Sequence, residues 1–92
     1  MTVKVRFFAR FRELFGTDIV TDVPDGSSFI DLVRRIAEKN TDGYAAIFDE
    51  NGSFREFVIL MKNGMRIDCA DAAATPVADG DEIAVFPPVA GG

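Results

Sequence analysis

The chain ends in two glycines, Gly91 and Gly92, and a carboxylate at such an end can be activated for acyl transfer. The pair closes an uncharged run, residues 87–92, which directly follows an alternating apolar run at residues 82–86. Glycine has no Cβ, so its backbone enters narrow channels and adopts angles that other residues disfavour. Most chain ends are inert, and an idle terminus is the alternative. We expect the carboxylate of Gly92 to be the reactive group of this chain.

The run before Gly92 suits delivery of a chain end to a buried site. Pro87 and Pro88 have no backbone N–H, so they end the preceding strand and keep the exit extended. Five or six residues at ~3.3 Å each reach roughly 16–20 Å. A carboxylate becomes an acyl donor only as a mixed anhydride, so an ATP-dependent enzyme must meet it there. We expect a domain over residues 1–86 and an extended tail over residues 87–92.

The rest of the chain offers no second reactive set. It has no histidine, which excludes a histidine base and a Cys-His nucleophile pair. Its one cysteine, Cys69, stands beside Asp68 and Asp71, and neighbouring acids raise the pKa of a thiol. The residue types also lack the spacing of a metal site or of a Gly-rich phosphate loop. We therefore predict no bound metal or cofactor and an inert thiol.

Length, composition and charge restrict the class of protein. The 92 residues make one small domain, and 48% hydrophobic residues with nine Phe exclude a disordered chain. The net charge of -5 argues against nucleic acid or an anionic membrane surface as a partner. No apolar run approaches the ~20 residues needed to span a bilayer. A single cysteine fits a reducing compartment, so we expect a cytoplasmic protein.

The first half of the chain predicts two strands and two helices. Residues 2–7 alternate with Val3, Val5 and Phe7 toward a core, and residues 18–23 form a second strand after a helical segment at 9–15. Residues 29–39 repeat apolar side chains with helical spacing, and the helix starts with Ser28 and Asp31 in a capping-box arrangement.

The second half predicts three more strands. Residues 57–61 form an apolar strand, Asn63 and Gly64 a tight hairpin turn, residues 65–68 the returning strand and residues 82–86 the last strand. Residues 40–57 are ambiguous, with a helical turn over residues 44–48. This order predicts an α+β fold of β-grasp type: a mixed sheet of four to five strands with one main helix on one face.

The other face of that sheet is left open by this arrangement. Strand alternation places Phe8 and Phe86 on it, with Ile59 or Met61 beside them. A cluster of exposed apolar side chains marks an interface, so we expect a protein partner to dock here. A shift of register would instead bury these side chains in the core.

Two segments resemble the small, sulfur-carrying subunit of molybdopterin synthase, which has the β-grasp fold of ubiquitin. These are residues 7–16, FFARFRELFG, and residues 79–92, DGDEIAVFPPVAGG. The resemblance implies a carrier that is not catalytic alone. An ATP-dependent activating enzyme adenylates Gly92, a sulfur donor converts it to a thiocarboxylate, and the large subunit uses the sulfur to build the molybdopterin dithiolene on precursor Z. Ala90 and Gly91 would line the entry channel, and Phe8 and Phe86 would dock both partners.

A long middle segment, FDENGSFREF at residues 48–57, is similar to the archaeal branch of this family. That branch includes ubiquitin-like modifiers attached to lysines of other proteins. The sulfur carrier of thiazole synthesis has a similar tail, but its domain is shorter and it usually lacks the Phe-Pro-Pro exit. Three functions stay open: sulfur carriage for a molybdenum or tungsten cofactor, protein conjugation, and a β-grasp interaction module with an idle tail.

Overall fold

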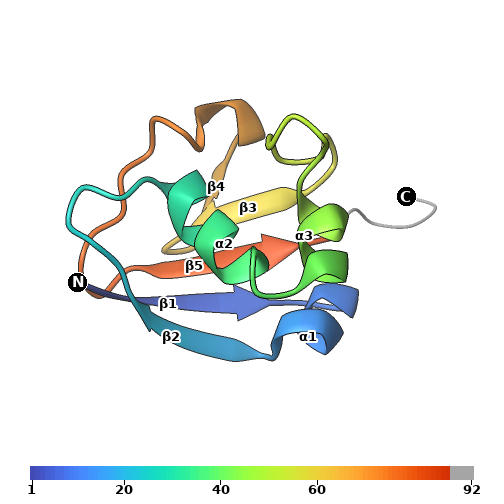
Figure 1. The fold of residues 1–92 in the computed structure, drawn as a ribbon. Helices are drawn as coiled ribbons and strands as arrows, with labels where there is room; N and C mark the ends of the chain where they lie inside the picture. The colour runs from blue at the N-terminus through green and yellow to red at the C-terminus, as the bar shows by residue number, and fades with distance from the viewer. Residues whose placement is uncertain (88–92) are drawn as a thin grey trace.

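The computed structural model describes residues 1–87 and contains one five-stranded mixed sheet with helices on one side (Figure 1). The elements in chain order are β1 (Thr2–Phe7), α1 (Arg10–Phe15), β2 (Asp18–Asp22), α2 (Phe29–Ala37), α3 (Thr41–Ile47), β3 (Ile59–Lys62), β4 (Met65–Ile67), the 3-10 helix η1 (Cys69–Asp71) and β5 (Glu82–Phe86).

The sheet has the order β2-β1-β5-β3-β4, so the first and last strands of the chain are neighbours near its centre. β1 and β5 run parallel, and the other three neighbouring pairs run antiparallel. A parallel pair needs a crossover connection, which the helical middle of the chain supplies. This arrangement confirms the expected β-grasp fold.

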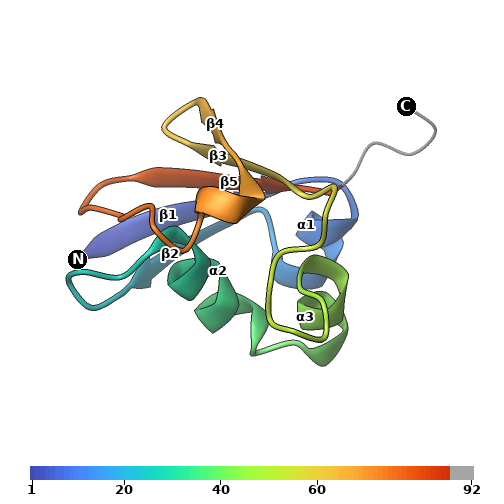
Figure 2. The ribbon, with the colours of Figure 1, turned by 90° about the horizontal axis from the view of Figure 1, so that it is seen from above.

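The core lies between the sheet and α2. Val3, Val5 and Phe7 of β1 are buried together with Ile83 and Val85 of β5, as strand alternation predicts. The buried side chains of α2 form its expected apolar stripe: Phe29, Leu32, Val33, Ile36 and Ala37. Each large apolar side chain that is fully buried contributes about 1.5–3 kcal/mol. Figure 2 shows α2 and α3 on the same side of the sheet, which leaves the opposite face open.

Local signals predicted in the sequence account for the ends of several elements. Ser28 and Asp31 form the predicted capping box, in which each side chain accepts a hydrogen bond from the other residue's backbone N–H. Asn63 and Gly64 form the predicted hairpin turn, with φ angles of 51° and 82°. Positive φ at both central positions is the geometry that favours Asn-Gly.

The ambiguous middle segment contains a full helix, α3, in place of the expected helical turn. The Asn40 side chain caps it by accepting from the Gly43 N–H at 2.9 Å, and donates to the Leu14 carbonyl at 3.0 Å. Gly43 packs against the ring of Phe15, where a Cβ would approach the ring atom Cε1 to 2.6 Å. The glycine therefore lets α3 lie close against α1.

The strand expected at residues 57–61 begins later, at Ile59. The Val58 N–H donates to the carbonyl of Arg55 at 3.1 Å, which closes a turn, and the Phe57 side chain is 69% exposed. The expectation of a strand start at Phe57 was wrong because an apolar run does not distinguish a strand from an exposed aromatic that precedes it.

The helices of the described part of the chain are all too short or too polar to cross a membrane. The described part covers the predicted domain over residues 1–86 and only the first residue, Pro87, of the predicted tail. Ala90, Gly91 and Gly92 lie outside the described residues.

Candidate functional site

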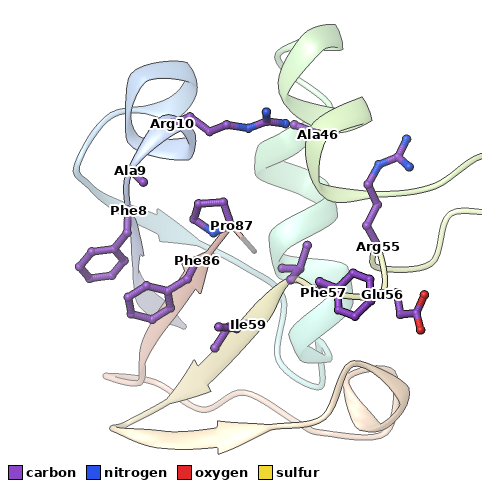
Figure 3. A pocket seen from close by; sticks show the side chains of 11 residues that line it. Phe8, Ala9, Arg10, Ala46, Arg55, Glu56, Phe57, Ile59, Phe86 and Pro87 are labelled. Carbon is purple, nitrogen blue, oxygen red and sulfur yellow. The ribbon is translucent and has the colours of Figure 1, made fainter. Parts of the chain in front are cut away.

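An apolar row crosses the open sheet face where the central strands end. The parallel pairing of Phe7 with Val85 brings the following residues, Phe8 and Phe86, side by side, and the Phe8 N–H donates to the Val85 carbonyl at 3.3 Å. Their rings stack with centroids 4.1 Å apart and 10° between the planes. Ile59 pairs with Phe86 across β3 and β5 and completes the row (Figure 3).

A second row on the same face contains Met61. It pairs with Ala84 on β5, which in turn pairs with Arg6 on β1. All four side chains predicted for docking, those of Phe8, Ile59, Met61 and Phe86, are half-buried in the isolated chain. The small Ala84 separates Met61 from Arg6. The fold therefore gathers these four side chains on one face, and their role in docking stays a prediction.

Arg6 sets the charge beside the aromatic pair. Its guanidinium lies 3.0 Å from an Asp18 carboxylate oxygen and 3.4 Å from one of Glu82. It also lies 5.7 Å from the centroid of the Phe8 ring, within cation–π range. The hydrogen bond to Asp18, and that to Glu82, raise the pKa of Arg6. Arg6 thus stays cationic, with its charge balanced by these two acids.

A pocket of about 910 Å³ opens at the end of β5, next to this row. Its apolar wall contains Phe8, Phe57, Val58, Ile59, Phe86 and Pro87. The remaining lining residues are Ala9, Arg10, Ala46, Arg55 and Glu56 (Figure 3). Pro87, the last residue that the structure describes, thus lies at this pocket.

Sequence reasoning missed several lining residues, among them Arg10, Arg55 and Phe57. These three come from the start of α1 and from the turn before β3, which are far apart in the chain. The apolar run at residues 57–61 drew attention to Phe57 but assigned it to a strand. The sequence offered no signal that would bring Arg10 together with Arg55 and Phe57.

The single thiol, that of Cys69, is not among the residues that line this pocket. Cys69 is half-buried, and its Sγ donates to the Val58 carbonyl at 3.2 Å. Burial raises the pKa of the Cys69 thiol, Asp68 raises it further, and Arg66 opposes them. The predicted direction is confirmed, with burial as the main cause in place of the neighbouring acids. Within residues 1–87, no group of three or more His, Cys, Asp or Glu could hold a metal ion.

Comparison with known proteins identifies a family. The model of the ThiS family matches residues 5–92. The chain is 39% identical over 92 residues to small archaeal modifier protein 3 of Haloferax volcanii, with both chains covered completely. It is 33% identical over 90 residues to the molybdopterin synthase sulfur carrier subunit of Escherichia coli, covering 98% of this chain and 99% of that protein.

Solved structures agree with this assignment. The crystal structure of SAMP1 from Haloferax volcanii matches with a TM-score of 0.86 and 25% identity, covering all of both chains. A complex of subunits 1 and 2 of the molybdopterin-converting factor from Helicobacter pylori contains a chain that matches with a TM-score of 0.61 and 28% identity, again over the full length of both. The chain is a β-grasp, ubiquitin-like protein and belongs to the ThiS family.

Proposed function

We propose that this chain is the sulfur carrier subunit of a molybdopterin synthase, with the sulfur held on the carboxyl group of Gly92. The observation that carries the proposal is the apolar row of Phe8, Phe86 and Ile59 beside the pocket that Pro87 lines. A docking surface at the base of an uncharged Gly-Gly tail suits a protein that delivers its own end to a partner. The sulfur carrier subunit of Escherichia coli, similar over nearly the full length, supports the same role.

The proposed chemistry has three stages: adenylation of Gly92, formation of the thiocarboxylate, and transfer of the sulfur to the pterin precursor. A carboxylate oxygen of Gly92 attacks the α-phosphorus of ATP held by an adenylating enzyme, and pyrophosphate leaves. Sulfide then attacks the acyl carbon and AMP leaves, which gives the thiocarboxylate; where a persulfide attacks instead, AMP leaves an acyl disulfide, and a thiol of the sulfur donor cleaves its S–S bond, which releases the thiocarboxylate and a new disulfide. In the large subunit, that sulfur attacks a carbon of the pterin precursor and displaces an oxygen substituent from it, and water then cleaves the acyl–sulfur bond to restore the carboxylate. ATP belongs to the adenylating enzyme, and this chain needs no bound cofactor of its own.

The chain itself supplies binding, reach and access. The five residues beyond Pro87 span at most about 16–18 Å when extended. This reach suits a partner whose active site lies at the bottom of a channel beside the docked sheet face. The carrier contributes mainly by placing its terminal thiocarboxylate within attack distance of the precursor, because such positioning lowers the barrier of the transfer reaction by several kcal/mol. ATP-dependent activation of this kind belongs to the cytoplasm.

Attachment to lysines of other proteins is the second candidate. The observation that favours it is the 39% identity to small archaeal modifier protein 3 over the complete length of both chains. The same acyl adenylate serves both functions, since a lysine amine or a sulfur nucleophile can displace AMP. The two functions differ only in the acceptor.

Activation is tested by ATP–pyrophosphate exchange with the cognate adenylating enzyme. Deletion of Gly92 should abolish exchange while thermal melting stays unchanged, because the carboxylate moves by ~3.3 Å. Normal exchange by the shortened chain contradicts both functions and favours an interaction module with an idle tail. Substitution of Glu50, on the loop before Phe54 and outside the pocket, by Ala gives a control that should exchange normally.

The two acceptors are separated by mapping conjugates in cells. Trypsin leaves a long branched remnant, because the chain has no Lys or Arg after Arg66. A protease that cuts near the tail is therefore needed to detect the remnant on target lysines. Conjugates that disappear on deletion of Gly92 identify a modifier, and their complete absence together with a thiocarboxylate identifies a dedicated sulfur carrier.

A further inference from the structure

Two arginines line the pocket. Arg10 is the first residue of α1, and Figure 3 shows its side chain reaching across toward Ala46 of α3. Arg55 follows Phe54 in the turn before β3 and lies beside the same end of α3. Both side chains are exposed, and neither forms an ion pair within residues 1–87. The pocket therefore presents two uncompensated cations from separate segments.

Hydrogen bonds within the domain explain the positions of these two arginines only in part. The Arg55 Nε donates to the Ala45 carbonyl at 2.7 Å and its backbone N–H to the Ile47 carbonyl at 2.9 Å, which satisfies the last turn of α3. No hydrogen bond occupies its two terminal nitrogens within the described residues. Arg10 makes no hydrogen bond there, and a cation at the start of a helix is unfavourable to the helix dipole. Hydrogen bonds and ion pairs among the described residues therefore give no reason for the position of the Arg10 side chain.

An exposed aromatic, Phe57, lies beside Arg55 at the same pocket. The Phe57 side chain is 69% exposed, so its ring adds little to the core. Glu56, the one carboxylate among the lining residues, points away from the Arg55 guanidinium in Figure 3. The pocket thus combines a large apolar wall with two cations, on a chain whose net charge is -5.

We propose that the large-subunit partner docks here with an apolar side chain between Phe57 and Phe86, flanked by a carboxylate that Arg10 and Arg55 hold. This inference rests on the proposed function and specifies the chemistry of its partner surface. A guanidinium binds a carboxylate through two parallel hydrogen bonds, which gives register as well as attraction. An extended polyanion does not fit, because the net charge of the chain repels it.

The test measures the affinity of the full-length chain for the cognate large subunit by calorimetry. Arg10→Glu and Arg55→Glu should each weaken binding by about tenfold or more, because a repelled carboxylate replaces a paired one. Phe57→Ala should weaken it by a similar factor. A rising salt concentration should weaken the binding of the unaltered chain to the large subunit more than it weakens the binding of either charge variant. Arg35→Glu, on the exposed side of α2, is the matched control and should bind as the unaltered chain does.

Three outcomes decide the inference. Unchanged affinity of Arg10→Glu and Arg55→Glu overturns it, as does an equal loss in Arg35→Glu. A loss of adenylation instead of large-subunit binding also overturns it, because the pocket then serves the activating enzyme. If Arg55→Glu lowers the melting temperature, Arg10→Glu decides alone, since the Arg10 side chain has no hydrogen bond or ion pair among residues 1–87 to lose. A separate arm, Phe86→Glu, tests the proposed function: if it binds normally, docking on the apolar row fails, whatever the arginines do.

Discussion

Replacement of Phe86 by Ala separates the contribution of the apolar row to folding from its contribution to docking. The Phe86 ring stacks on Phe8 at 4.1 Å and pairs across the sheet with Ile59, but it stays half-buried in the isolated chain. None of the core side chains of β5 is touched, because Ile83 and Val85 point to the opposite face. We therefore expect a folded variant that binds its partner poorly.

Phe86→Ala should reduce the stability of the domain less than it reduces the affinity for the partner. Loss of the aromatic stack removes about 1 kcal/mol of stability, which lowers the melting temperature of a domain this small by roughly 4–8 °C. Truncation of an interface anchor costs roughly 2 kcal/mol, or about 30-fold in the dissociation constant. Binding should thus suffer more than folding, and most of the loss should lie in the dissociation rate.

Circular dichroism melting measures the loss of stability, and calorimetry with the large subunit measures the loss of affinity. Val20→Ala is the control: Val20 is 66% exposed, lies on the edge strand β2 where it pairs with Lys4 of β1, and does not line the pocket. It should bind normally. The reasoning is refuted if Phe86→Ala binds as tightly as the unaltered chain, or if it unfolds and Val20→Ala loses affinity equally.

Three further changes test other parts of the account. Cys69→Ser should be adenylated and carry sulfur normally in a transfer assay, since burial raises the pKa of the thiol; a variant that is adenylated but never gains sulfur contradicts this. Gly43→Ala should lower stability by about 1–3 kcal/mol in denaturant melts despite the better helix propensity of Ala, because the new Cβ meets Phe15; a more stable variant would show that the ring moves aside freely. Burial raises the pKa of Asp81, but hydrogen bonds from Asn63 and the Ala78 N–H, with Lys62 nearby, bring it below its usual value. That carboxylate therefore stabilises the fold above its unfolded pKa of about 3.9 and loses this effect as the pH falls through the lower folded pKa. The difference in melting temperature between the unaltered chain and Asp81→Asn should be largest at neutral pH and should shrink in acid. A difference that does not change with pH would refute stabilisation by the ionised Asp81 carboxylate.

The sheet was predictable because its signals are local. Alternation places Val3, Val5 and Phe7 on one face, and Asn63 with Gly64 sets the hairpin. The full extent of α3 was not predictable, because its position depends on the contact of a glycine with a distant ring. Helix propensity alone disfavours a glycine inside such a segment.

The sequence predicts some residues of the candidate site and not others. Phe8 and Phe86 follow from strand alternation, and the parallel register that stacks their rings follows from the order of the strands. Arg10, Arg55 and Phe57 meet at one pocket only through the packing of α1 and α3 against the end of the sheet. No spacing in the chain relates Arg10 to Arg55 and Phe57, so only the structure brings the three residues together.

The mass of the intact chain, isolated from its own cells, tests the central claim most directly. Sulfur carriage predicts a fraction of chains heavier by about 16 Da, the difference between sulfur and oxygen, with the gain located at Gly92 by fragmentation. Addition of the large subunit and the pterin precursor should return that fraction to the unmodified mass. A chain that never shows the gain, in cells that make the cofactor and contain active adenylating enzyme, would contradict the account.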